Sequence, residues 1–305
     1  MKSTSRESTA GETESPQPED VGFESASSPR QRQSDLPFVE ELEFPLSPET
    51  TSGNKSKDLI IAGIPIANLS EDEAVALIDE MISVGGPHFG AVVNAAKVVA
   101  AERDPELKRA LLDADFVTAD GMSVVWASHL LGPGLKQRVT GIDLFERLLA
   151  HGEKQQLSVY FLGAHDESVR GVVEFSKRSY PSLRIAGYHN GYFAESENDV
   201  VCDEIMQSRA DLLFVAMGSP KQELWIASNL LCTGVRFALG VGGSFDHLSG
   251  KVQRAPVWMQ KSGLEWLHRF VQEPTRLWRR YLIGNSAFIL LIVRQLVGGS
   301  RSSKA

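Results

Sequence analysis

The 305-residue chain has only two cysteines, Cys202 and Cys232, and neither has a second cysteine at metal-ligand spacing. This scarcity excludes a zinc site built on cysteine pairs. It fits a reduced cytosolic setting, in which we expect both thiols to be buried as small apolar groups. The N-terminus also lacks the apolar segment of a secretory signal.

Long hydrophobic runs are missing as well. The run from Tyr281 to Val297 is apolar but is interrupted by Asn285, Ser286, Arg294 and Gln295. A membrane span needs about 20 predominantly apolar residues, so this run is short and broken. Two alternatives stay open: an interfacial helix with basic flanks, or a buried terminal helix.

Familiar cofactor and catalytic motifs are absent from the sequence. Gly240-Val241-Gly242-Gly243 matches part of a phosphate loop, but the full G-x-G-x-x-G spacing is missing. No Ser-His-acid motif, kinase motif or metal-ligand cluster appears. His129, His165 and His189 lie apart, and we interpret them as structural or surface residues.

The net charge of −8 argues against a general nucleic-acid binder, but the charge is unevenly spread. After Gly250 the chain carries ten basic residues, opposed only by Glu265 and Glu273. A basic end on an acidic protein indicates an anionic partner, either phosphates or a membrane surface.

Composition divides the chain into three parts. Residues 1–57 are rich in Ser, Glu, Pro, Gln and Thr, which predicts a disordered acidic segment. From 58 to 250, apolar strand-like runs alternate with helical patterns. This alternation predicts an α/β, Rossmann-like core, with a mostly parallel sheet covered by helices on both faces. Residues 251–305 are expected to form a helical, basic appendage.

Polar and small residues stand where the predicted strands end: Asn94, Asp120, Gly163, Gly218 and Gly242. Open α/β sheets bind ligands at the carboxyl ends of their strands, so we expect these residues to converge. By itself, Asp120 before a glycine could simply cap the following helix. The convergence favours a functional site instead.

The polar residues of this set fit one kind of chemistry. A carboxylate such as Asp120 can act as a general base towards a hydroxyl. Arg138 and arginines of the appendage can hold a diphosphate, while Asn94 and Gln222 can bind sugar groups. Such a set fits metal-free group transfer from a nucleotide diphosphate to an alcohol. Taken singly, Arg138 and Arg269 could be surface ion-pair partners and Gln222 an exposed helix residue.

Several motifs together resemble those of the bacterial WecG/TagA/CpsF glycosyltransferases, over about Leu59 to Tyr281. The residues that carry the resemblance are Asn94 with 97–101, Thr118–Gly121, Arg138–Gly141 with Asp143, Gly218–Glu223 with Trp225, Gly242–Asp246, Arg254–Pro256, Glu265–Arg269, and Glu273–Pro274 through Arg279–Tyr281.

The resemblance implies an inverting enzyme of polysaccharide synthesis with no catalytic metal or other cofactor. It would move N-acetylmannosamine, or its uronic acid, from UDP to a sugar on a polyprenyl diphosphate. Asp120 would be the base, and Asn94, Arg138 and Gln222 would line the pocket. Gly163, Gly218 and Gly242 would lie near the nucleotide.

For the appendage, the resemblance implies closure over the site, with Arg269 and Arg276 as candidate ligands, and contact with the membrane. The expected location is therefore cytoplasmic, peripheral at the inner face of the membrane. Self-association into a homo-oligomer is left open, and no nucleic-acid partner is expected.

One position departs from the family pattern. Val92 stands where many members have Thr, which raises the alternative of a different donor sugar. A second alternative is a non-catalytic nucleotide-sugar-binding or scaffold subunit of a polysaccharide assembly complex.

Overall fold

A computed structural model describes residues 58–256, 258–259, 265–272 and 274–302. The segment 1–57, for which we predicted disorder, lies outside the described residues. The description also leaves out the side chains at 269, 274–283 and 299–302.

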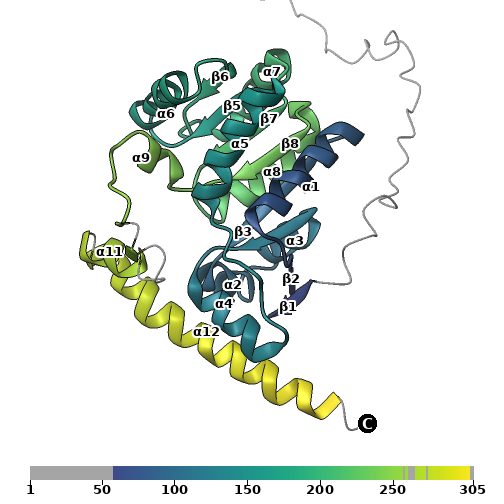
Figure 1. Ribbon diagram of the computed structural model, residues 1–305, viewed down its shortest axis with the longest axis vertical. Coiled ribbons are helices and arrows are strands. Elements are labelled where there is room, and N and C mark those ends of the chain that lie inside the picture. The colour runs from purple at the N-terminus through teal and green to yellow at the C-terminus, as the bar shows by residue number, and fades with distance from the viewer. Residues whose placement is uncertain (1–57, 257, 260–264, 273, 303–305) are drawn as a thin grey trace, which may run out of the picture. The chain divides into compact units, whose positions relative to one another are not determined.

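A six-stranded, wholly parallel sheet forms the centre of the fold (Figure 1). The strands lie in the order β4-β3-β8-β7-β5-β6. Their bounds are β3 His88–Val93, β4 Phe116–Ala119, β5 Ser158–Gly163, β6 Arg184–His189, β7 Leu212–Ala216 and β8 Phe237–Gly240. The sheet confirms the predicted α/β class.

Helices cover both faces of the sheet, because side chains alternate between the two faces along each strand. In β7, Leu212 and Phe214 join the core on one face, and Leu213 and Val215 join the core on the other. The first face packs against α1 Glu71–Val84, α5 Gly141–Gln155, α6 Asp166–Ser179 and α9 Ser244–Leu248. The second packs against α2 Ala95–Ala101, α3 Pro105–Asp113, α4 Met122–Leu131, α7 Asn198–Ser208 and α8 Lys221–Thr233.

Helix starts follow the local sequence signals. Ser70 caps α1 by accepting from the backbone N–H of Glu73, whose side chain accepts from the Ser70 N–H in return. This is the capping box expected from Ser70-Glu71-Asp72-Glu73. Asp104 caps α3 ahead of Pro105, a residue that the first helical position tolerates. A single-turn helix, η2 Glu195–Glu197, precedes α7.

The first apolar run forms a separate hairpin rather than a strand of the main sheet. We expected one strand with a turn from Leu59 to Ile64. Instead, β1 Leu59–Ile61 and β2 Ile64–Ile66 pair antiparallel with each other. Three-residue strands are too short for sequence periodicity to reveal how they pair.

The C-terminal helices are longer than expected. We expected short helices from Arg254 to Tyr281 and a separate helix from Tyr281 to Val297, but the chain forms α11 Glu265–Gln272 and then one continuous helix, α12 Pro274–Ser302. Phe288 and Ile292 bury one side of α12 in the core cluster around α2. Gln295 holds the β1–β2 hairpin, since its Nε2 donates to the Ile60 carbonyl at 2.7 Å and its Oε1 accepts from the Ala62 N–H at 2.9 Å.

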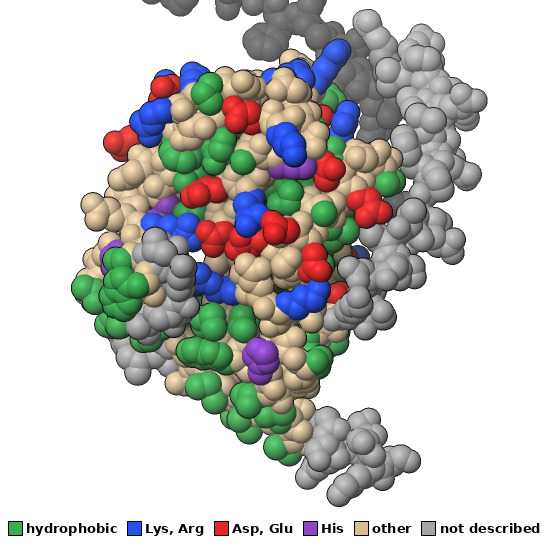
Figure 2. Space-filling model, in the orientation of Figure 1, with side chains coloured by type: hydrophobic (Ala, Val, Ile, Leu, Met, Phe, Trp, Pro, Cys, Tyr) green, Lys and Arg blue, Asp and Glu red, His purple; other side chains and the backbone are tan. Residues whose placement is uncertain are grey.

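The other side of α12 is apolar and exposed. Its exposed residues are Ile289, Leu290, Val293, Leu296 and Val297, and Trp126 and Leu130 of α4 are exposed as well. Figure 2 shows apolar side chains around α4 and α12 with no acidic side chain visible among them. One side of this helix is therefore buried, as the second alternative predicted, and the interfacial alternative stays a prediction. None of the described helices is both long and apolar enough to cross a bilayer.

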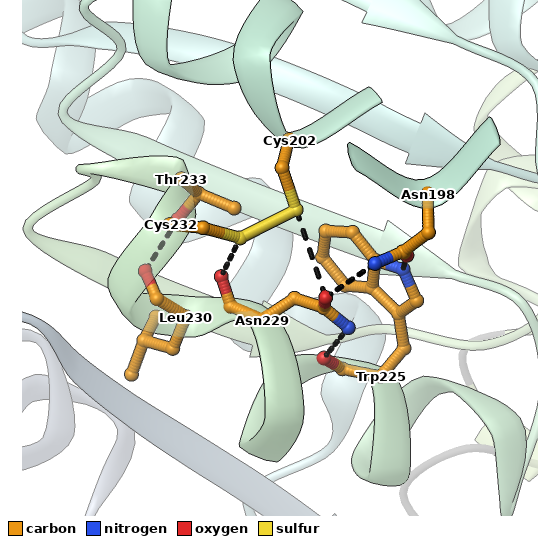
Figure 3. The surroundings of a disulfide bond; sticks show 7 residues. All are labelled: Asn198, Cys202, Trp225, Asn229, Leu230, Cys232 and Thr233. Atoms are coloured by element: carbon orange, nitrogen blue, oxygen red, sulfur yellow. Dashed lines mark hydrogen bonds between the residues drawn. A yellow bond between two sulfur atoms is a disulfide. The ribbon is translucent and has the colours of Figure 1, made fainter. Parts of the chain in front are cut away.

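The two cysteines form a disulfide, so the prediction of separate buried thiols is wrong (Figure 3). Cys202 of α7 is buried, whereas Cys232 of α8 is exposed, and their Cα atoms are 5.8 Å apart. Residues 30 positions apart meet because α7 and α8 pack against each other, which cysteine spacing alone cannot reveal.

Reduction of this disulfide should destabilise the protein. Cross-linking a loop of this length is expected to stabilise by about 3 to 4 kcal/mol. Dithiothreitol should then lower the thermal midpoint by roughly 5 to 15 °C in a calorimetric scan. The double variant Cys202→Ala/Cys232→Ala is the control and should melt at one temperature with or without reductant. An unchanged wild-type midpoint would contradict a stabilising bond.

Candidate active site

A cavity of about 520 Å³ opens at the carboxyl ends of four neighbouring strands, β4, β3, β8 and β7. Its lining includes the segments that follow these strands, together with parts of α2, α8, α9 and α11. The polar and charged side chains in the lining are Asn94, Lys97, Asp120, Ser219, Gln222, Ser244, Asp246, His247 and Gln272. The cavity lies where an open α/β sheet is expected to bind its ligand.

Asp120 lines this cavity directly after β4. Its backbone N–H donates to the Val93 carbonyl at 2.7 Å, which ties it to the end of β3. The alternative that Asp120 caps α4 is wrong, because Gly121 is the N-cap and no side chain caps that helix. Asp120 therefore lies at the cavity without serving as the N-cap of α4.

Asn94, at the start of α2, and Gln222, on α8, both line the same cavity. Asn94 caps α2, since its Oδ1 accepts from the Lys97 N–H at 3.0 Å. The amide NH2 of Asn94 is not used by this cap, so it can still donate to a ligand. Gln222 is 2% exposed, so the alternative of an exposed helix residue is wrong.

The three glycines assigned to the nucleotide divide into two groups. Gly218 and Gly242 line the cavity, as expected. Gly163 does not lie among the residues that line it. A Cβ on Gly163 would come within 2.5 Å of the Ala216 backbone, and its φ is +132°. Glycine at 163 is thus explained by close packing of β5 against β7.

Arg138 does not line the cavity but lies beside it. The next residue, Val139, donates its N–H to the Ala119 carbonyl at 3.1 Å, one residue before Asp120. The guanidinium of Arg138 pairs with Glu265 of α11, Nη1 to Oε2, at 3.3 Å. In this structure Arg138 therefore links the core to α11.

Arg254 extends this ion pair into a cluster of charged side chains that further links the core to the C-terminal appendage. Arg254 pairs with Asp143 at 2.5 Å and lies 3.7 Å from Glu265. Although burial acts to lower the pKa of Arg254, its hydrogen bond with Asp143 and nearby acids raise it overall. Burial also raises the pKa of Glu146, with Arg254 opposing and Asp143 adding to the shift. The Arg254–Asp143 pair holds Arg254 against α5.

The appendage also contributes to the cavity itself, through Gln272 at the end of α11. Arg269 and Arg276, the arginines expected to bind the ligand, lie on α11 and α12. Their side chains lie outside the description, so their assignment stays a prediction. Within the described residues, no three His, Cys, Asp or Glu side chains gather as metal ligands would.

Six polar or charged side chains of the cavity were not predicted as site residues: Lys97, Ser219, Ser244, Asp246, His247 and Gln272. Asp246 is anchored by the Ser168 hydroxyl, which donates to its Oδ1 at 2.7 Å. Lys97 lies three residues after Asn94, and Asp246 lies four after Gly242. These two residues could have been found because they lie close in sequence to residues already assigned to the site.

Comparison with known proteins identifies the family of this chain. The family model described as the glycosyl transferase WecG/TagA/CpsF family matches residues 59–302. The chain belongs to this family. All of α11 and α12 fall within the matched range, which extends past Tyr281, where we expected the resemblance to end. The protein is thus a glycosyltransferase in which the long C-terminal helix belongs to the family pattern.

Two Bacillus relatives of this glycosyltransferase carry the name N-acetylglucosaminyldiphosphoundecaprenol N-acetyl-beta-D-mannosaminyltransferase. The one from Bacillus spizizenii is 39% identical over 182 residues, which cover 60% of this chain and 70% of the relative. The one from Bacillus subtilis is 36% identical over 190 residues, 62% of this chain and 73% of the relative.

Proposed function

We propose that this glycosyltransferase transfers N-acetylmannosamine from a UDP donor to N-acetylglucosamine on a polyprenyl diphosphate. The names of the two Bacillus relatives support this choice of sugars and lipid. The observation that carries the proposal is the meeting of Asp120, Asn94 and Gln222 at one cavity. A carboxylate and two amides there suit a hydroxyl that must lose a proton and a sugar that must be held.

In the proposed reaction, Asp120 takes the proton from the acceptor hydroxyl. The acceptor oxygen forms a bond to the anomeric carbon of the donor as the bond from that carbon to the diphosphate oxygen breaks. Attack from the face opposite the leaving UDP inverts the anomeric configuration. The proton ends on the Asp120 carboxylate, and the negative charge ends on UDP.

The departing diphosphate needs cationic partners, because charge builds on its oxygen as the bond breaks. Arg138, Arg269 and Arg276 are our candidates for this role. To reach a diphosphate, the Arg138 guanidinium would exchange or share its contact with Glu265. Gly218 and Gly242 would let the nucleotide approach the backbone closely.

Transfer can be tested with purified protein, a set of UDP sugars and a lipid-diphosphate N-acetylglucosamine acceptor. We expect UDP release and a lengthened acceptor with UDP-N-acetylmannosamine. The control donor is UDP-N-acetylglucosamine. It should give at least about tenfold less product, which corresponds to a difference of about 1.4 kcal/mol in transition-state binding. Binding of UDP without turnover of any donor would favour the scaffold alternative instead.

We also propose that α12 binds the cytoplasmic face of the membrane, where a lipid-linked acceptor would lie. From Pro274 to Ser302 the helix carries five arginines and no acid. Its exposed apolar residues lie on the side that does not pack on α2. An apolar face with basic residues is typical of a helix that lies in the plane of a membrane surface.

Binding to vesicles containing phosphatidylglycerol tests this role. The double variant Ile289→Asp/Val293→Asp should bind such vesicles more than about tenfold more weakly, because two apolar side chains are replaced by acids. Leu231→Asp on α8 is the matched control, since Leu231 is also exposed but lies far along the chain from α12. Equal sedimentation of all three proteins with vesicles would contradict the proposal.

A further inference from the structure

A buried ion pair lies at the cavity, and one of its members, Lys97, belongs to the cavity lining. Nζ of Lys97, on α2, lies 2.6 Å from Oε1 of Glu223, on α8. The two side chains are 9% and 4% exposed. Lys97 also donates to the Val92 carbonyl at 2.6 Å, two residues before Asn94. The pair therefore connects the end of β3 to α8.

Gln222 extends this connection to the segment after β8. Its Nε2 donates to Oε1 of Glu223 at 2.8 Å, and its Oε1 accepts from the Gly242 N–H at 3.0 Å. Its side chain lies so close to Gly240 that a Cβ there would meet Nε2 at 2.6 Å. Four segments thus share one chain of hydrogen bonds: the end of β3, α2, α8 and residues 240–242.

The donors and acceptors in this chain allow only one orientation of the Gln222 amide. A carboxylate accepts hydrogen bonds and cannot donate, so Glu223 requires the NH2 group of Gln222 to face it. If the amide turned over, its oxygen would face the Glu223 oxygen and its NH2 would face the Gly242 N–H. Both contacts would then be lost inside a buried site, where an unpaired polar group is costly.

Lys97 is needed to keep Glu223 as the acceptor that fixes the Gln222 amide. Without its charge, Glu223 would be a buried carboxylate with one amide as its partner, and burial strongly disfavours an uncompensated charge. Glu223 Oε2 has no hydrogen-bond partner among the described residues, so Oε1 carries both contacts. In both of these contacts the Glu223 carboxylate is the acceptor.

We propose that Lys97 and Glu223 are positioning residues that lock the Gln222 amide, so that Gln222 can act towards the donor sugar only as a hydrogen-bond donor. Its oxygen is held by Gly242, and one N–H is held by Glu223. The second N–H of the amide remains for the cavity. Its partner on the sugar must be an acceptor, such as the carbonyl oxygen of an acetamido group. This role rests on the proposed function.

The lock can be removed without leaving a lone charge. The double variant Lys97→Met/Glu223→Leu replaces the buried pair by apolar groups, an exchange that is often neutral for stability. Glu223→Gln is the conservative variant, because its side-chain oxygen can still accept from both Lys97 and Gln222. Asn229→Ala is the control on the same helix: it removes bonds to Trp225 and Asn198, away from the cavity (Figure 3).

Amide hydrogen exchange of the ligand-free, full-length protein is the first measurement. The double variant should exchange the Gly242 N–H at least tenfold faster than wild type, with little change in thermal midpoint. Glu223→Gln should restore most of the protection. Asn229→Ala should lower the midpoint and leave exchange at 240–243 unchanged. If the Gly242 N–H exchanged at the wild-type rate in the double variant, the proposed positioning role of Lys97 and Glu223 would be contradicted.

Calorimetric titration is the second measurement, with UDP-N-acetylmannosamine and with UDP alone as probes. The double variant should bind the sugar nucleotide at least tenfold more weakly and UDP within about threefold of wild type, because Gln222 is assigned to the sugar. Equal weakening for both probes, or none, would overturn the positioning role. If wild type fails to bind or turn over any UDP sugar, the proposed function fails, and the exchange measurement still decides the lock.

Discussion

Asp120→Ala should lower the rate of sugar transfer by about a thousandfold or more while leaving the fold intact. A positioned general base contributes about 10²- to 10⁴-fold, and no other carboxylate is assigned to the acceptor hydroxyl. The side chain does not cap α4, so its removal costs no helix-capping bond. The measurement is UDP release in steady state, with the thermal midpoint taken on the same sample.

Two further variants make the test of Asp120 specific. Asp120→Asn keeps the shape of the side chain but cannot accept a proton at neutral pH, so it should be nearly as slow as the alanine variant. Asp113→Ala removes an exposed acid at the end of α3 and should retain wild-type activity. If Asp120→Asn turned over at the wild-type rate, another group would have to be the base.

The second large effect is expected at Arg138. Arg138→Ala should lower kcat/KM by about a hundredfold, because charge-assisted contacts to a diphosphate are worth about 1.5 to 3 kcal/mol each. Glu265→Ala removes the partner that Arg138 has in this structure and leaves Arg138 itself available. Its loss of kcat/KM should stay within about tenfold, from looser attachment of α11.

The two variants separate diphosphate binding from attachment of the appendage. If Arg138 only anchored α11, both substitutions would cause the same loss, and the double variant would lose no more than either one. If Arg138 binds the diphosphate, the alanine variant at 138 should also bind UDP more weakly in a titration, whereas the variant at 265 should not. Equal, non-additive losses would contradict the proposed ligand role.

Most of the sheet could be predicted from sequence because the signal is local. The strands of a parallel sheet buried on both faces appear as short apolar runs, such as Leu212 to Ala216. The capping box at Ser70 and the Asp104-Pro105 start were equally local. The β1–β2 hairpin and the full length of α12 were not predicted, since they depend on what the chain packs against.

The site was predictable to the extent that it follows strand ends. Asp120, Asn94, Gly218 and Gly242 line the cavity, as the strand-end rule required. Gly163 also follows a strand, but a neighbouring backbone occupies the space beside it. The sequence shows which residue follows a strand, but it does not show whether another segment fills the space beside that residue.

Local patterning along the chain accounts for the α/β class, the order of helices and strands, and the edge of the sheet where the cavity opens. Contacts between residues far apart account for the rest: Lys97 with Glu223, Arg138 with Glu265, Cys202 with Cys232, and Phe288 with α2. The physical reason is that secondary-structure propensity acts within a few residues. Ion pairs, cross-links and core contacts arise only when folding brings distant segments within a few ångströms.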